Sequence, residues 1–229
     1  MRFLILTMSL LSAAAVGRGA IIQRIHYAPP QLPSAQGWTY FVPEVVPERD
    51  AFQIRNDLLV MDTRGLGGNI FCGYTHPLAE VATATRVTAS MRCRMLAIEP
   101  MENSFGLSLG ASYRIDGGQA RIATILLGLD FLRIAGTAIT VPVDATAWHD
   151  YTVDLDLTAL TAEVSIDGLP VAESPLGVLS VGSGLTFGDT ITPNNAWVEI
   201  AWVAGDLGDG GGVAAAAATW SAVKALFTD

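Results

Sequence analysis

Hydrophobic and polar residues alternate with a period of two in the stretch 148–168. The apolar positions are Tyr151, Val153, Leu155, Ala162, Val164 and Ile166, and the polar ones are mostly His149, Asp154, Asp156, Glu163 and Ser165. A period of two places alternate side chains on opposite faces of an extended chain. We therefore predict two antiparallel strands here, with one face in the core and the other facing water or a ligand.

Two longer runs follow the same rule. Residues 85–98 alternate apolar residues with Arg, Thr and Ser, and residues 104–115 alternate large apolar residues with Ser, Gly and Arg. The small residues of the second run predict a shallow, flat outer face. Glycine-rich turn signals separate such runs, and no helical period longer than two turns occurs before residue 213. The pattern predicts an all-β fold, namely a two-sheet antiparallel β-sandwich of jelly-roll type with a short C-terminal helix.

The first 19 residues have the layout of a secretory signal peptide. Met1-Arg2 supplies the positive charge, and an apolar run extends from Phe3 to Val16. The small residues near the end of this run are typical of a signal-peptide cleavage site. The run is shorter than the roughly 20 residues that a membrane-spanning helix needs. Export is the predicted fate, so the mature protein is expected in the extracellular space or cell envelope without a transmembrane segment. A buried N-terminal strand or helix is the alternative.

The rest of the chain divides into four predicted parts. Residues 20–36 are an extended, proline-rich segment, and residues 37–205 form the sandwich domain. Residues 206–212 are rich in glycine and predict a flexible linker. Residues 213–229 predict a short amphipathic helix. Docking of this helix on its own domain, a role in sorting or assembly, and disorder are all open.

Four motifs, in this order, resemble the concanavalin A-like, laminin G-like jelly-roll superfamily. They are Trp148-His149, VSIDG at Val164–Gly168, LTFGD at Leu185–Asp189 and AWVEIAWV at Ala196–Val203. The resemblance covers about residues 37 to 205 and implies the fold. It does not select a function, because the superfamily includes glycan-binding modules, glycan-cleaving enzymes and adhesion or structural domains.

The net charge and the mean hydropathy of the chain limit the classes of partner that it is expected to bind. The net charge is −9 with only 13 Lys and Arg residues, which argues against nucleic acid as a partner. The mean hydropathy of +0.41 is high for a soluble protein. An apolar outer surface that packs against copies of the same chain would account for part of it.

Two cysteines, Cys72 and Cys93, lie in predicted strands. In an exported chain an even pair predicts one disulfide between neighbouring strands. Two buried free thiols are the alternative. A metal site at these residues is disfavoured, because no His or Cys lies at ligand spacing from either of them.

The chain has no clear catalytic pattern. Asp154 and Asp156 share a strand face, and Glu163 falls on the neighbouring predicted strand, but no E-x-D-x-E string occurs. A retaining glycosidase needs two carboxylates about 5 Å apart in one cleft. His76 and His149 have no paired nucleophile in a recognisable motif. A solvated outer face is the simpler interpretation of these acids.

The predicted ligand-binding residues are those that would share one face if the two long strands were neighbours. They are Arg92, Arg94, Ser108, Ser112 and Arg114. Guanidinium groups there would bind carboxylates of an acidic glycan or of a partner protein. Arginines that merely solubilise an exposed sheet are the alternative. No metal or cofactor is predicted, although loop acids such as Asp62, Asp116 and Asp189 leave Ca²⁺ open.

These observations predict an exported, non-catalytic β-sandwich protein. It would act as a glycan- or protein-binding module or as a self-associating extracellular component. The alternative is a polysaccharide-cleaving enzyme, a glycoside hydrolase or a lyase, of the same fold.

Overall fold

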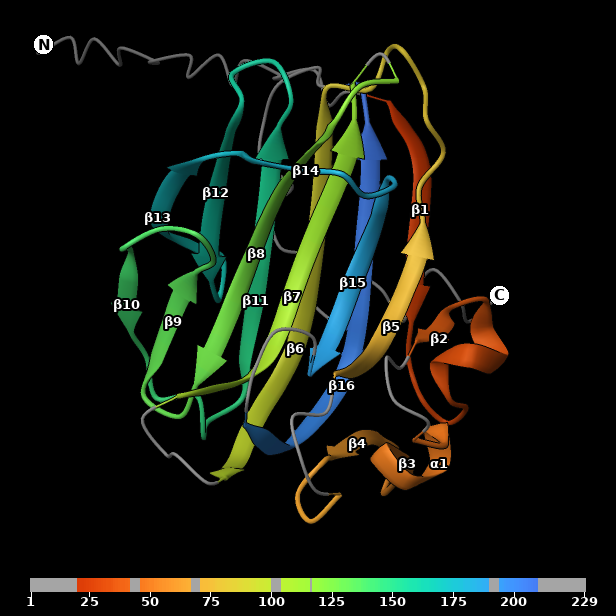
Figure 1. The fold of residues 1–229 in the computed structure, drawn as a ribbon, viewed down its shortest axis with the longest axis vertical. Coiled ribbons are helices and arrows are strands. Elements are labelled where there is room, and N and C mark those ends of the chain that lie inside the picture. The colour runs from red at the N-terminus through yellow and green to blue at the C-terminus, as the bar shows by residue number, and fades with distance from the viewer. Residues whose placement is uncertain are drawn as a thin grey trace, which may run out of the picture.

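The computed structural model describes residues 20–41, 46–66, 71–99, 104–115, 117–189 and 194–209. They form two antiparallel eight-stranded sheets, called sheet A and sheet B, which pack face to face. Figure 1 shows sheet B in front of sheet A. The predicted two-sheet β-sandwich is confirmed. Two short helical segments, η1 (Pro33–Gln36) and α1 (Glu48–Ala51), precede the main strands.

Sheet A has the strand order β13-β12-β11-β6-β16-β4-β3, and β1 also pairs with β16. Its strands are β1 (Ile21–Tyr27), β3 (Phe52–Arg55), β4 (Leu58–Asp62), β6 (Arg86–Glu99), β11 (His149–Asp156), β12 (Thr161–Ile166), β13 (Leu169–Pro175) and β16 (Asn195–Gly208). The two long strands β6 and β16 lie side by side at its centre.

Sheet B has the strand order β10-β9-β8-β7-β15-β5-β2, and β14 also pairs with β8. Its strands are β2 (Thr39–Phe41), β5 (Cys72–Pro77), β7 (Phe105–Arg114), β8 (Ala120–Gly128), β9 (Phe131–Ile134), β10 (Thr140–Pro142), β14 (Gly177–Leu179) and β15 (Gly184–Asp189).

The core lies between the sheets and follows from the alternation. On β6, Val87, Ala89, Met91, Cys93 and Met95 are buried, whereas the residues between them are partly exposed. Large side chains of sheet B, such as Leu109 and Phe187, are fully buried in the same core. Burying a side chain of this kind stabilises the fold by about 1.5–3 kcal/mol.

Two glycines permit close approach of the backbone. A Cβ atom at Gly205 of β16 would lie 2.1 Å from Leu185 Cδ1 of the opposite sheet. Gly188 of β15 has φ +130°, and a Cβ atom there would lie 2.6 Å from the Cys72 carbonyl oxygen. Any larger residue at either position would displace the neighbouring sheet or strand.

The domain extends further at both ends than predicted. Residues 21–27 of the expected extended segment form β1, which pairs with β16. Residues 206–208 of the expected linker belong to β16 itself. The predicted signal peptide, the rest of the linker beyond residue 209 and the predicted C-terminal helix lie outside the described residues. Among the residues described, no helix has the length and apolar character needed to cross a membrane.

The predicted disulfide is not present. Cys72 lies on β5 of sheet B and Cys93 on β6 of sheet A, so the two do not occupy neighbouring strands, and both are free and buried. Burial raises the pKa of the Cys72 thiol to about 12 and also raises that of Cys93. Because the thiolate is the reactive form, both thiols are chemically quiet in the folded protein.

The edge strand β13 contains Pro170 and Pro175. Its pairing with β12 also shifts register between Val164 and Ser165. Proline donates no backbone hydrogen bond and is found in sheets mainly on edges.

Candidate functional site

The structure separates the five predicted ligand-binding residues into two groups. Arg92 and Arg94 lie on β6 of sheet A, whereas Ser108, Ser112 and Arg114 lie on β7 of sheet B. The two strands follow each other in the chain but belong to opposite sheets. The expectation that all five share one face is therefore wrong.

Both arginines of sheet A are paired with acids of the same chain. Arg92 Nη1 lies 2.8 Å from Asp150 Oδ1, and Arg94 Nη2 lies 2.7 Å from Glu199 Oε2. The Arg94 guanidinium also lies 5.1 Å from the ring centre of Trp148. These contacts occupy the charges that a free carboxylate ligand would need.

The acids considered for catalysis lie on the same outer face. Asp154 and Glu163 are cross-strand partners on β11 and β12, as predicted. Asp154 is held by Arg86, whose Nε lies 2.7 Å from Asp154 Oδ1 and whose Nη2 contacts Oδ2. These hydrogen bonds raise the pKa of Arg86. Asp154 is thus a fixed ion-pair partner on an open sheet face.

The residues of sheet B hold a crossing segment in place. This segment, residues 177–183, is called the strap; it begins as β14 beside β8 and then crosses the end of β7 on the way to β15 (Figure 1). Ser112 Oγ donates to the Gly182 carbonyl at 2.8 Å, and Arg114 Nε donates to the Val181 carbonyl at 2.8 Å. Ser108 Oγ donates to the Gly188 carbonyl at 3.1 Å. The two serines therefore have structural partners.

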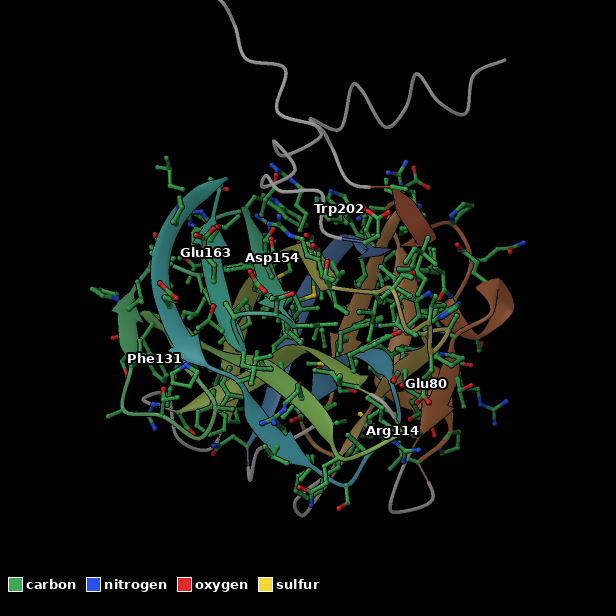
Figure 2. The ribbon with its side chains drawn as sticks, turned by 90° about the horizontal axis from the view of Figure 1, so that it is seen from above. Glu80, Arg114, Phe131, Asp154, Glu163 and Trp202 are labelled. Atoms are coloured by element: carbon green, nitrogen blue, oxygen red, sulfur yellow. The ribbon has the colours of Figure 1, made fainter. Side chains whose placement is uncertain are left out.

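A pocket of about 270 Å³ opens where the strap meets the end of β7. It is lined by Glu80, Val81, Ala82, Ala84, Tyr113, Arg114, Ile115 and Gly117. Figure 2 shows the two charged lining residues, Glu80 and Arg114, close together on the sheet B side. Of the five predicted residues, Arg114 alone lines this pocket.

Ser183 of the strap fixes both sides of the pocket. Its Oγ donates to Glu80 Oε1 at 2.9 Å and accepts from the Arg114 backbone N–H at 2.9 Å. Its carbonyl accepts from the Leu78 N–H at 3.1 Å. Among the described residues, Glu80 and Arg114 form no ion pair with each other, and the Arg114 terminal nitrogens have no hydrogen bond. A polar ligand between them would therefore find both a donor and an acceptor.

Tyr113 forms part of the wall and is 2% exposed. Its hydroxyl accepts from the Val81 N–H at 2.6 Å and lies 3.0 Å from the Val81 carbonyl, to which it donates. These contacts to the backbone saturate the hydroxyl. Tyr113 is therefore a wall of the pocket and not a free acid or base.

Two of the three acids considered for Ca²⁺, Asp62 and Asp189, have partners within the protein. Asp62 binds Arg64 at 2.9 Å, and Asp189 is buried and accepts from Thr63 Oγ1 at 2.9 Å. Asp116 lies outside the described residues. The described part of the chain contains no group of three His, Cys, Asp or Glu side chains that could hold a metal ion.

Comparisons with known proteins place the fold. No protein-family model matches the sequence, and a search of curated proteins found no match. Among solved structures, a native glycosidic hydrolase is similar with a TM-score of 0.53 at 12% identity, over 85% of this chain and 100% of that one. A carbohydrate esterase from Shiga toxin-encoding bacteriophage phi24B has a TM-score of 0.52 at 14% identity, over 76% and 92%.

A third similar structure is the basic winged bean lectin with Tn-antigen. Its TM-score is 0.51 at 11% identity, over 81% of this chain and 99% of that chain. At such low identities the likeness shows the fold alone.

Proposed function

We propose that this chain, a concanavalin A-like jelly roll, is a non-catalytic glycan-binding module whose ligand site is the pocket beside the strap. The observation that carries the proposal is that one carboxylate, Glu80, and one guanidinium, Arg114, line the same pocket together with apolar walls and are not paired with each other.

The chemistry of the pocket suits a sugar ring. Each sugar hydroxyl both donates and accepts hydrogen bonds, so a carboxylate and a guanidinium together satisfy neighbouring hydroxyls. Val81, Ala84 and Ile115 supply apolar walls for the C–H surface of the ring. A lectin, a glycosidic hydrolase and a carbohydrate esterase share the fold, which supports a carbohydrate ligand without selecting one.

Binding is favoured over cleavage by the composition of the pocket. Glycosidases use two carboxylates that flank the scissile bond. Glu80 is the one carboxylate among the lining residues, and the Tyr113 hydroxyl is saturated by the backbone. A polysaccharide-cleaving enzyme of the same fold is thus the less supported candidate.

The proposed site of action is outside the cell. Its support is the signal-peptide layout of residues 1–19. Glycans of a cell surface or envelope would be accessible to a module exported in this way.

The test is binding of the purified protein to a panel of neutral and acidic oligosaccharides, followed by calorimetry with the Glu80→Gln variant. The glutamine keeps an oxygen for Ser183 but loses the charge. For a bound oligosaccharide we expect at least a tenfold rise in Kd, which corresponds to about 1.4 kcal/mol. Glu173→Gln is the matched control, because Glu173 is exposed on β13 of the other sheet.

Three outcomes would contradict the proposal. They are no binding across the panel, equal Kd values for the wild type and Glu80→Gln, and release of shortened products. The third would establish the enzymatic alternative.

A further inference from the structure

A second group of aromatic and charged side chains lies on the outer face of sheet A. This Trp–Arg band consists of Trp148, Asp150, Arg92, Arg94, Glu199 and Trp202. Figure 2 shows Trp202 on the far side of the sandwich from Arg114. The band is therefore separate from the pocket and not used by the proposed function.

A β-bulge places Trp202 on this face. In the pairing of β16 with β6, Ile200 is opposite Cys93 and Trp202 is opposite Arg92, so β16 carries one extra residue between them. Ile200 and Val203 on either side are fully buried, whereas Trp202 is partly exposed. Bulges commonly re-aim a side chain in this way. Within the described residues, Trp202 has no ring contact and no cation over its ring.

Electrostatically the band is balanced. Arg92 pairs with Asp150, and Arg94 pairs with Glu199, so two positive and two negative groups cancel in a chain of net charge −9. The Arg94 guanidinium also lies over Trp148. The charged groups are held in fixed positions and leave no unpaired arginine for an anionic partner.

We infer that the Trp–Arg band is a second binding surface, and that its ligand is an uncharged polysaccharide strand. The partly exposed indole of Trp202 offers an apolar surface for the C–H groups of a sugar ring. The paired carboxylates and guanidiniums keep lone pairs and N–H groups for hydroxyls. Because its positive and negative groups cancel, the Trp–Arg band offers no electrostatic attraction to an acidic glycan or a basic protein.

Two surfaces on opposite sides of one domain have a functional consequence. A single module would hold two glycan strands at once, or two points of one strand, and gain avidity without any contact between modules.

The test is affinity electrophoresis and calorimetry with soluble neutral polysaccharides, namely galactomannan, mixed-linkage β-glucan and dextran, at low and high NaCl. We expect Trp202→Ala to weaken binding of at least one of them at least tenfold, and Trp202→Phe to weaken it less than fivefold. Leu169→Ala, which removes an apolar side chain 69% exposed on the edge strand β13, is the control and should change nothing. Unchanged far-UV circular dichroism and melting of Trp202→Phe keep the comparison valid if the alanine variant is destabilised.

The test separates the band from the pocket. The band predicts that Glu80→Gln retains the Trp202-dependent binding, with little dependence on salt. Equal binding by the wild type and both Trp202 variants would overturn the inference. So would tighter, salt-sensitive binding of an acidic polysaccharide such as polygalacturonate. A concentration-dependent dimer lost in Trp202→Ala would show instead that a second copy of the chain covers the band.

Discussion

On sheet A the polar side chains of neighbouring strands bond to one another, whereas the outer face of sheet B is built of small residues and crossed by the strap. The Arg–acid pairs between strands, such as Arg86–Asp154 and Arg94–Glu199, all lie on sheet A within the described parts of the chain. On sheet B, β7 carries Ser108, Gly110 and Ser112 between its core-facing residues, and all three are buried.

This difference teaches how two similar alternating strands acquire different roles. Long charged side chains on β6 reach sideways and pair with acids of the neighbouring strands. Short side chains on β7 leave room for the strap, and Ser112 donates to the Gly182 carbonyl of the strap. Ser108 donates to the Gly188 carbonyl of the neighbouring strand β15. The pocket opens where the strap meets the end of β7.

The largest effect should come from crowding the close approach of β15 to its neighbour β5 within sheet B. Gly188→Ala would place a Cβ atom 2.6 Å from Gly73 Cα, at a φ of +130° that side chains rarely adopt. We expect a loss of about 3 kcal/mol in the free energy of unfolding, measured with urea. Gly182→Ala is the control, because a Cβ atom there meets nothing within 4 Å, and it should change stability by less than about 0.5 kcal/mol. Equal losses would show that the close approach of β15 to β5 does not require glycine at position 188.

On sheet A, the contribution of each ion pair to the free energy of unfolding should depend on how deeply the pair is buried. The Asp154 and Arg86 side chains are 14% and 26% exposed, against 30% and 39% for Asp150 and Arg92. Asp154→Asn should cost about 2 kcal/mol and Asp150→Asn less than about 1 kcal/mol, because water screens the more exposed pair. Urea unfolding at about 0.05 and about 0.5 M NaCl measures both losses, because salt in roughly this range screens exposed charges. A larger loss of stability in Asp150→Asn than in Asp154→Asn would contradict the prediction that the more buried pair contributes more.

The smallest effect is a pH dependence at the turn that ends β12. Burial opposes ionisation of Asp167, but hydrogen bonds from the Asp150 N–H and from His149 outweigh it and lower its pKa. A lowered pKa in the folded state adds stability above the unfolded value of about 3.9, and that stability is lost as the pH falls through the folded value. Because the Asp167 side chain is 50% exposed, the gain is less than about 1 kcal/mol.

Asp167→Asn should therefore be less stable than the wild type at pH 7, and the difference should shrink as the pH falls below about 4. Thermal unfolding from pH 7 to pH 3 measures it. Asp130→Asn, at an exposed carboxylate whose side chain makes no hydrogen bond within the described residues, is the control. A stability difference between the wild type and Asp167→Asn that grows as the pH falls would contradict the predicted direction of the pH dependence.

Much of the fold could be predicted from the alternation. The run at residues 85–98 corresponds to β6, and its apolar positions are the buried ones. Alternation tells which face a side chain occupies but not which sheet a strand joins. For this reason the sequence alone allows Arg94 and Ser108 to share one surface, although β6 and β7 lie in opposite sheets.

The site was harder to predict, because its contacts are distant in sequence. Glu80 lies in a loop without periodicity, and its partner Ser183 is 103 residues away. Arg114 was identified for its charge, yet its position in the pocket depends on the strap. The sequence predicts only that Trp202 belongs to a strand, because the bulge that turns it outward depends on the pairing of β16 with β6 and has no signal in the sequence.

The prolines of β13 bear on how this protein can assemble. An exposed edge usually invites another chain to add a strand, which is a common start of aggregation. At Pro170 and Pro175 the edge lacks backbone donors, and the nearby register shift bends the row of hydrogen-bonding groups. Growth by strand addition is therefore blocked at this edge. Copies that associate through it must do so by side-chain contact, which leaves each sandwich closed and separately folded.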